Sequence, residues 1–180
     1  MHRVPETLTT RRLVLRRPKL SDAAAIYEYG GDPEVTRYMD WPTNSSVADV
    51  VARLEGAGLR WESGEEYSWV ITVKPGDRPI GSVACCFRGH AVDLGYVLSR
   101  NNWGRGYATE AAKSVLQWAA TLEGVHRIWA TCDVENTASA RVLEKIGMSR
   151  EGVLRRWAHR PNLPPQPPRD AFVYSWVSEA

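Results

Sequence analysis

The chain has 180 residues, of which 43% are hydrophobic and 24% charged, and its formal net charge at pH 7 is +2. This composition is typical of a soluble globular protein, and so small a net charge gives no general reason to expect nucleic-acid binding. The chain contains no run of 18 apolar residues, so neither a membrane-spanning helix nor a membrane partner is expected.

The length and the cysteine content of the chain indicate its number of domains, its cellular location and whether it binds a metal. A chain of this size predicts a single domain, residues 1–180. Its first residues, MHRVPETLTT, lack the apolar stretch of a signal peptide. The three cysteines include the adjacent pair Cys85 and Cys86, and they match neither a disulfide framework nor the spacing of metal ligands. We therefore expect a cytoplasmic protein that holds no metal.

The first third of the chain predicts one strand followed by helices. RRLVLRR (11–17) alternates apolar and polar residues, which indicates a short strand. AAAIYEYG (23–30) follows a Ser-Asp cap and ends in glycine, which is typical of a short helix. DPEVTRYM (32–39) predicts a further helical turn with its proline near the start. A longer amphipathic helix is predicted from about 46 to 61.

The middle of the chain contains three apolar segments in succession. These are YSWVITVK (67–74), PIGSVACCF (79–87) and AVDLGYVLS (91–99), and each indicates a strand. KPGDRP, between the first two, has the residues of a tight turn. Because short links join neighbouring strands in opposite directions, we expect antiparallel pairing.

The order of elements then changes to alternating helices and strands. The segment after Gly106 has apolar residues at a helical period. A strand at 126–134, a helix at 137–147 and a final strand at 170–177 follow. PNLPPQPP (161–168) is expected to be a loop, because proline is excluded from the interior of a sheet. The pattern predicts an α/β fold.

The segment NNWGRGYATEAAKSVLQ (101–117) starts a helix without a Ser or Asp cap. The first turn of a helix has unpaired backbone N–H groups and the positive end of the helix dipole. Gly104 and Gly106 would let a ligand approach those groups closely, which predicts a site for phosphate or pyrophosphate. A tight turn without a ligand is the alternative. The P-loop and dinucleotide-binding patterns are both absent.

The same segment resembles the acetyl-CoA-binding segment of the GNAT N-acetyltransferases. Their signature is Gln or Arg, two residues, Gly, one residue, then Gly or Ala, and this chain departs from it only at the first position, Asn101. TTRRLVLRRPKLSDA, DLGYVL and VENTASARVLEKIGM resemble the branch that contains the ribosomal-protein alanine N-acetyltransferases, and EGVLRRW and DAFVYSWV match it more loosely. The resemblance covers nearly the whole chain.

The resemblance implies a fold and a set of coenzyme contacts. The fold is a mixed, mostly antiparallel sheet of six to seven strands with about four helices, splayed between parallel strands near 91–98 and 126–133. Acetyl-CoA is implied as co-substrate, with these residues in contact with it: Val97, Leu98, Ser99, Trp103, Gly104, Arg105, Gly106, Tyr107, Ala108, Asn136 and Arg141. Asn136 could also be a helix cap, Arg105 a solvated loop residue, and Arg141 and Lys145 surface residues.

The chemistry implied by the resemblance is direct attack of an amine on the thioester. The amine must first lose a proton, and the departing thiolate should gain one. Asp93 matches the family carboxylate that accepts the amine proton through a water. His90, His159 and Glu66 remain alternatives.

The proton donor is less obvious, because many GNAT proteins have a tyrosine where this chain has Leu143. In the ribosomal-protein branch a serine serves as the acid, and Ser139 matches it, four residues earlier on the same helix face. A serine near the start of a helix is also commonly a cap or a small packing residue. Both roles stay open for Ser139.

The amine acceptor is expected to contact Arg37, Tyr38 and Trp41 and the loop at 158–170, because loops on a rigid scaffold carry specificity. The basic C-terminal part could favour an acidic acceptor or exclude a basic one. The proline-rich loop could be a recognition edge or a dimer contact, so a monomer and a homodimer both remain open.

The function predicted from the sequence is therefore acetyl-CoA-dependent N-acetylation of a primary amine, either a protein N-terminus or a small molecule. A module that binds acetyl-CoA as a sensor without turnover is one alternative. A binder of a different phosphate compound is another.

Overall fold

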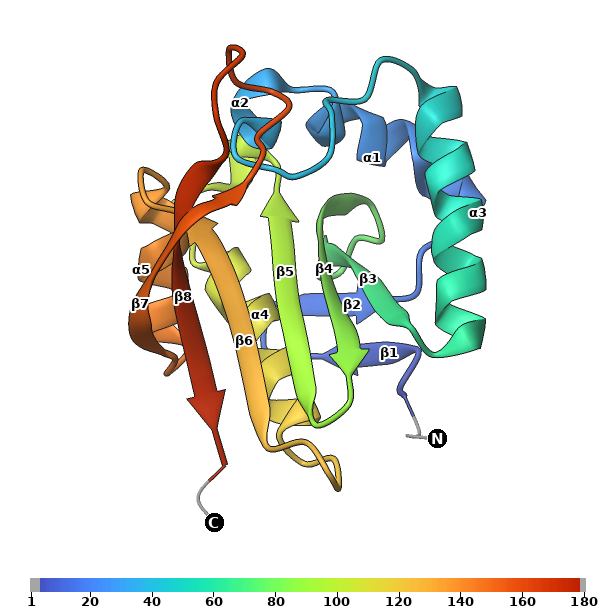
Figure 1. Cartoon of the computed structure of the whole chain (residues 1–180). Helices are drawn as coiled ribbons and strands as arrows, with labels where there is room; N and C mark the ends of the chain where they lie inside the picture. The colour runs from blue at the N-terminus through green and yellow to red at the C-terminus, as the bar shows by residue number, and fades with distance from the viewer. Residues whose placement is uncertain (1–3, 179–180) are drawn as a thin grey trace.

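The structure of the chain, a computed structural model, describes residues 4–178 and is built on one open sheet (Figure 1). The strands are β1 (Thr7–Thr9), β2 (Leu13–Arg16), β3 (Glu66–Val73), β4 (Pro79–Arg88), β5 (Ala91–Leu98), β6 (Arg127–Asp133), β7 (Ser149–Ala158) and β8 (Arg169–Val177). The helices are α1 (Ala23–Gly30), α2 (Pro33–Thr36), α3 (Val47–Ser63), α4 (Tyr107–Ala119) and α5 (Thr137–Lys145).

The strands lie in the order β1-β2-β3-β4-β5-β6-β8-β7. Neighbouring strands are antiparallel except β5 and β6, which are parallel. The predicted antiparallel run from β3 to β5 and the mixed α/β class are therefore confirmed. Within residues 4–178 the sheet has eight strands and five helices beside it, slightly more than predicted. β1 was missed because three residues, only one of them apolar, show no alternation.

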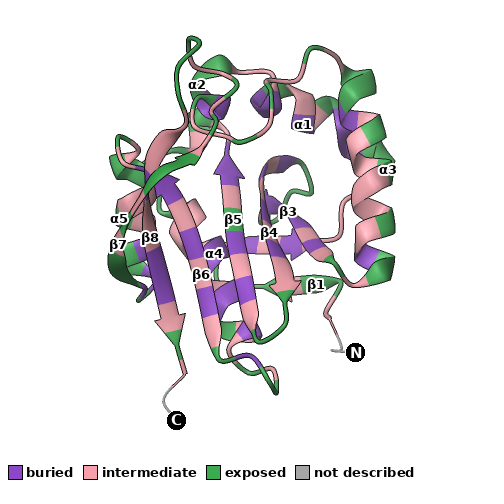
Figure 2. Ribbon diagram, in the orientation of Figure 1, coloured by how far each residue is buried: buried purple, intermediate pink, exposed green. Residues whose placement is uncertain are grey.

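The helices cover the two faces of the sheet in separate groups (Figure 1). Alternate residues along each strand face opposite sides. Trp69 and Ile71 of β3 join the larger core, together with Val115 of α4. Val70, between them, packs with Val50 of α3 in a smaller cluster. Figure 2 shows that the central strands are largely buried, whereas the outer surface of α3 is exposed.

Local signals explain where α3 begins and ends. The Ser46 hydroxyl accepts a hydrogen bond from Asp49 N (3.2 Å), and the Asp49 carboxylate accepts one from Ser46 N (3.0 Å). This reciprocal pair is a capping box. Gly64, with φ of 79°, follows the last turn in the left-handed conformation that glycine adopts at low cost. The helix is therefore fixed at both ends.

The parallel strands β5 and β6 are paired over only three positions, Ala91 with Arg127, Val92 with Ile128 and Asp93 with Trp129. Beyond Asp93 they separate toward the α2 end of the molecule (Figure 1). We call this separation the fork. The predicted splay between these two strands is confirmed.

No helix within residues 4–178 is both long and apolar enough to cross a membrane.

Candidate active site

The fork opens into a cavity of about 540 Å³ that reaches both faces of the sheet. Its α4–α5 side is lined by Leu94, Tyr96, Cys132, Asn136, Ser139 and Leu143. Its α1–α3 side is lined by Tyr38, Asp40, Trp41, Arg53, Asp93 and Arg160. A molecule in the fork would therefore touch both groups, which come from segments far apart in the chain.

The loop before α4 has the conformation that its glycines permit. Gly104 and Gly106 have φ of 72° and 76°, values that a residue with a Cβ rarely adopts. α4 begins at Tyr107, and no side chain caps it. Space is open at Gly104, where an added Cβ would meet nothing within 4 Å. The first turn thus has N–H groups without a side-chain acceptor, as a phosphate site requires.

Arg12, which the sequence did not single out, holds this loop in place. Its Nη1 donates to the Arg105 carbonyl (2.9 Å), and its Nε donates to Glu110 of α4 (2.7 Å). Its guanidinium also lies 4.6 Å from the centroid of the Tyr107 ring. The side chain of Arg105 itself is exposed.

The edge of β5 that faces the fork presents backbone groups of alternate residues. Ser99 N donates to Ile80 O (2.8 Å), which fixes the register with β4. The N–H and C=O groups of successive residues in a strand point to opposite sides. Those of Val97, like Ser99 N–H, therefore point toward β4, and those of Tyr96 and Leu98 point toward the fork. The Leu98 carbonyl accepts a hydrogen bond from the Trp103 indole (2.7 Å). Of the three predicted contact residues, only Leu98 has its backbone directed at the fork.

The start of α5 brings three polar side chains together. The Asn136 side-chain oxygen accepts a hydrogen bond from Ser139 N (3.1 Å), so Asn136 is the helix cap. The interpretation of Ser139 as the cap was wrong. Its hydroxyl is instead 2.8 Å from the hydroxyl of Tyr96 on β5. Arg141 and Lys145, on the same helix, are exposed.

Tyr96 was missed as a site residue, because the family tyrosine was sought on the helix and not on the strand. Burial raises the pKa of its hydroxyl, and the hydrogen bond with Ser139 opposes that rise. Leu143, where relatives have tyrosine, is a core residue with 1% exposure. Cys132 also lines this side, and burial raises the pKa of its thiol to about 11. A tyrosine hydroxyl is therefore present in the cavity after all.

Asp93 lies at the base of the fork, at the last position where β5 and β6 are paired. Burial raises the pKa of its carboxyl to about 6; the charge of Arg88 lowers it and that of Asp40 raises it. A carboxyl with this pKa is deprotonated at neutral pH yet basic enough to take a proton, which is what a general base requires.

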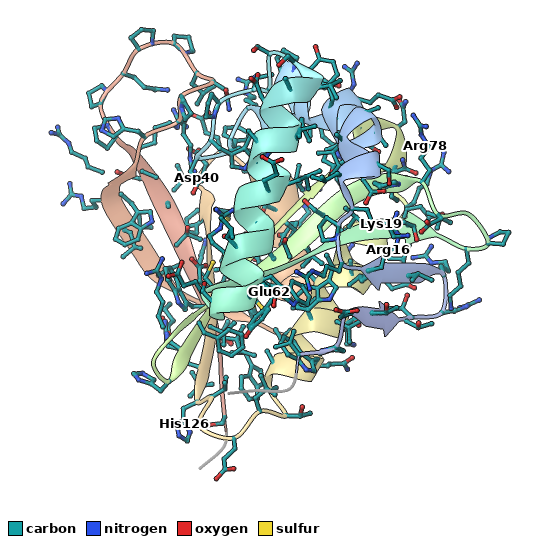
Figure 3. All side chains as sticks on the ribbon, turned by 90° about the vertical axis from the view of Figure 1, so that its right-hand side faces the viewer. Arg16, Lys19, Asp40, Glu62, Arg78 and His126 are labelled. Atoms are coloured by element: carbon teal, nitrogen blue, oxygen red, sulfur yellow. The ribbon has the colours of Figure 1, made fainter. Side chains whose placement is uncertain are left out.

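The alternative bases lie in different surroundings. Glu66 lines the cavity but forms an ion pair with Arg60 (Oε2–Nε 3.0 Å). His90 and His159 are both exposed, and neither lines the cavity. Figure 3 places Asp40 beside α3, near the open end of the fork, and His126 at the opposite end of the sheet. Geometry therefore favours Asp93 among these candidates.

The segment between α2 and α3 forms part of the α1–α3 side. Tyr38 and Trp41, two of the three residues predicted to contact the acceptor, line the cavity. Arg37 is exposed and lies outside it, 5.5 Å from the Tyr38 ring centroid. The Arg53 guanidinium of α3 lies 4.6 Å from the centroid of the Trp41 ring. Arg53 was not recognised in the sequence because its position resembles any polar position on an amphipathic helix.

Within residues 4–178, no three His, Cys, Asp or Glu side chains come together as a possible metal-ligand set. The three cysteines are free thiols.

The sheet is thus divided between two parallel strands, beside an uncapped helix that follows a glycine loop. Residues 12–149 match the family model described as the acetyltransferase (GNAT) domain. The chain belongs to the GNAT acetyltransferase family.

Individual relatives agree with this assignment. The uncharacterized N-acetyltransferase p20 of Bacillus licheniformis is 36% identical over 159 residues, covering 83% of this chain and 86% of the relative. A GNAT-family acetyltransferase structure from Bacillus anthracis has a TM-score of 0.82 at 26% identity, covering 95% of this chain and 98% of its own. RimL, the ribosomal L7/L12 α-N-protein acetyltransferase in complex with coenzyme A, has a TM-score of 0.84 at 18% identity, covering 96% and 98%, and so shares the fold.

Proposed function

We propose that this protein transfers the acetyl group of acetyl-CoA to a primary amine by direct attack of the amine. One observation carries the proposal: Asp93 and the Tyr96–Ser139 pair line the same cavity from opposite sides of the fork. A base on one side and hydroxyl donors on the other are the two groups that the transfer needs.

The coenzyme fits the α4–α5 side on two grounds. The uncapped first turn of α4, with Gly104 and Gly106 before it, suits a pyrophosphate. The backbones of Tyr96 and Leu98 face the fork, where no strand lies beside them, and a pantetheine arm carries amides that can pair with such groups. Of the remaining predicted contacts, Asn136 lines the cavity, and residues 103–108 form the loop before α4 and the start of its first turn. Bound acetyl-CoA supplies the activated acyl group as a thioester.

Asp93 accepts the proton of the incoming ammonium, directly or through a water. The amine lone pair then forms the new C–N bond, and the C–S bond breaks. The surroundings of Asp93 suit this role, because burial holds the pKa of its carboxyl near 6. The predicted alternative, a sensor without turnover, gains no support from a cavity that keeps such a base.

The departing thiolate receives a proton or a hydrogen bond from the Tyr96–Ser139 pair. The two hydroxyls are 2.8 Å apart, and the Tyr96 hydroxyl also lies 3.1 Å from the Ser139 carbonyl. When Tyr96 donates its proton to either Ser139 oxygen, the proton of the Ser139 hydroxyl is the one available to the cavity. Ser139 lies in the first turn of α5, close to the cap Asn136, so the positive end of the helix dipole also acts on the leaving sulfur.

The acceptor is an amine that enters from the α1–α3 side. RimL is named as an α-N-protein acetyltransferase, which supports a protein N-terminus, and the volume of the cavity also suits a small amine.

Release of free thiol from acetyl-CoA tests the proposal. The protein is incubated with acetyl-CoA and a panel of amines and short peptides, and thiol and acetylated product are both quantified. We expect thiol release in step with amide formation, and loss of both in the Asp93→Asn variant. Tight acetyl-CoA binding without product from any amine would instead favour the sensor.

A further inference from the structure

Most charged side chains that line the cavity are paired. Arg60 pairs with Glu66 (3.0 Å), and Asp133 pairs with Arg169 (2.6 Å) and Arg160 (3.7 Å). Three others, Asp40, Asp93 and Arg53, make no ion pair with any residue in the described part of the chain. The cavity therefore contains two carboxylates and one guanidinium that have no ion-pair partner among the described residues.

Arg53 is the unusual member of this set. Burial lowers the pKa of its guanidinium, but an arginine keeps its charge in proteins. Among residues 4–178 it has no hydrogen-bond acceptor, and its contact is with the face of Trp41, 4.6 Å away. A guanidinium has five N–H donors, and leaving them without acceptors in a partly buried site is costly. The cost is offset when a ligand supplies the acceptor.

The segment that carries Trp41, on which Arg53 stacks, is hydrogen-bonded to the proline-rich loop. Asn162, in the proline-rich loop, donates to the carbonyls of Trp41 (2.9 Å) and Thr36 (2.7 Å). Its side-chain oxygen accepts from Thr43 N (2.7 Å). The loop is thus fastened to the α2–α3 segment, and Trp41 is held where Arg53 stacks on it. Such a fixed cation is preorganised for an incoming anion.

A second arginine supports the same interpretation. The side chain of Arg160 is 7% exposed and lines the cavity, and its Nε has no hydrogen-bond partner. Its ion-pair partner Asp133 is already bound by two nitrogens of Arg169 (2.6 and 2.9 Å). Arg160 therefore has donors left over. It lies two residues before Asn162, in the segment that fastens Trp41.

We infer that the acceptor amine also carries a carboxylate, which Arg53 binds while the ammonium faces Asp93 and Asp40. This inference rests on the proposed function. The cavity charges complement a zwitterion, because its cation meets the two unpaired carboxylates and its anion the unpaired guanidinium. Arginine binds a carboxylate through two parallel hydrogen bonds. Arg160 is the second donor to the same anion.

The carboxylate can belong to a small amino acid or to an acidic side chain near the N-terminus of a peptide. Three matched pairs separate these sources. β-Alanine and 4-aminobutyrate are each compared with their own primary amide. The third pair is the C-terminally amidated tripeptides Ala-Asp-Ala and Ala-Asn-Ala. Each pair differs in one charge and almost nothing else. We expect kcat/KM for the carboxylate member to exceed that for its amide by about 10–100-fold in at least one pair.

Two variants assign the preference to Arg53. Arg53→Met keeps the length and apolar character of the side chain and removes the charge, so it should bring the ratio of kcat/KM for each carboxylate to that for its amide close to one. Arg60→Met, on the same helix and also lining the cavity, removes an arginine that already has a carboxylate partner. The ratio of carboxylate to amide should persist in Arg60→Met.

Binding gives a readout independent of turnover. Calorimetric titration of the protein–CoA complex with each acidic acceptor and its amide should show the same preference, and Arg53→Met should remove it. Arg53→Met should also melt no earlier than the wild type, because it deletes an unpaired, partly buried charge.

The results separate this inference from the proposed function. Acetylation or binding of carboxylate and amide acceptors with equal efficiency would overturn the inference and leave the transferase standing. Persistence of the preference in Arg53→Met would also overturn it. Carboxylate-selective binding without product from any acceptor would support Arg53 and refute the transfer reaction.

Discussion

The two sides of the fork are built in different ways. On the α4–α5 side, short sequence segments form the site: a glycine loop runs directly into α4, and Asn136 caps the helix that carries Ser139. On the α1–α3 side, residues from α3, β5 and two loops more than a hundred positions apart meet around one space. On the first side the sequence pointed to every polar group named here except Tyr96. On the second side it pointed to single residues, Tyr38, Trp41 and Asp93, and gave no sign of Arg53 or of how these residues meet.

The polar groups of the two sides differ as well. Hydroxyls and caps on the α4–α5 side bond to one another, as in the pair Tyr96 and Ser139. Unpaired charges remain on the α1–α3 side at Asp40, Arg53 and Asp93. In a coenzyme site common to a family, the polar side chains can be hydrogen-bonded to one another. In a site specific for one acceptor, charged side chains can remain without a protein partner and pair with the charges of that acceptor. The predictions below test whether the two sides act separately.

The largest expected effect is on the α4–α5 side. Gly106→Asp places a side chain and a negative charge where the pyrophosphate is proposed to bind, so binding of acetyl-CoA should fall below detection in calorimetry. Gly106→Ala is the matched control, because it introduces a Cβ at the same φ of 76° without the charge. It should bind acetyl-CoA much more tightly than Gly106→Asp. Equal loss in both folded variants would point to backbone strain and against a phosphate site.

The next effect belongs to the base of the fork. Asp93→Asn should lower turnover by about 10²–10⁴-fold and leave acetyl-CoA affinity nearly intact, because only the proton acceptor is lost. Glu66→Gln, which changes a carboxylate already paired with Arg60, is the control and should keep most activity. Similar losses in the two variants would argue against a special role for Asp93.

The pH dependence sharpens the same point. The pKa of Asp93 is raised to about 6, so wild-type kcat/KM should fall as pH falls through about 6, and this step should vanish in Asp93→Asn. The native state binds this proton more tightly than the unfolded chain does. The native state therefore loses stability as pH rises from about 4 to about 6. At pH 7 Asp93→Asn should melt later than the wild type; an earlier melt would contradict this assignment of the pKa.

A smaller effect is expected from filling the α1–α3 side. Gly95 of β5 lines the cavity, and a Cβ added there would meet no atom within 4 Å. A larger side chain at this position would therefore extend into the cavity. Gly95→Val should raise KM for the amine by about tenfold, because one buried aliphatic group is worth about that much, and should not change acetyl-CoA affinity. Gly95→Ala should have an intermediate effect. Equal weakening of both substrates would mean that the two sides share the space at Gly95.

The smallest effect is expected at the hydroxyl pair. Ser139→Ala and Tyr96→Phe each remove a 2.8 Å hydrogen bond, which costs about 1 kcal/mol of stability. If the pair protonates the thiolate, turnover should also fall several-fold in each, and the double variant should lose little more than the worse single one. Unchanged turnover with earlier melting would leave the pair a purely structural role. Leu143→Tyr is no substitute test, because Leu143 is fully packed and a larger ring would overfill the core.

Local patterns determined most of the fold in advance. The strands β3 to β5, the helices α3 and α4 and the β6–α5 unit were predicted because their apolar periodicity and their glycine, proline and serine ends are encoded within a few residues. The polar edge strand β7 was recognised only through the loose family match, because an edge strand exposed to solvent shows little alternation.

The sequence by itself determined the glycine loop and the uncapped start of α4, because each depends on neighbouring residues. Motifs spread over nearly the whole chain indicated the family, and the resemblance pointed to Asp93. Only the tertiary structure decided that Tyr96 meets Ser139, that Asn162 fastens Trp41, and that Arg53 lacks a carboxylate partner. Tyr96 and Ser139 are 43 positions apart in the chain, and Asn162 and Trp41 are 121 positions apart. The lack of a carboxylate partner for Arg53 depends on which residues pack around it. Contacts between distant segments depend on how the elements pack, and no local pattern records that packing.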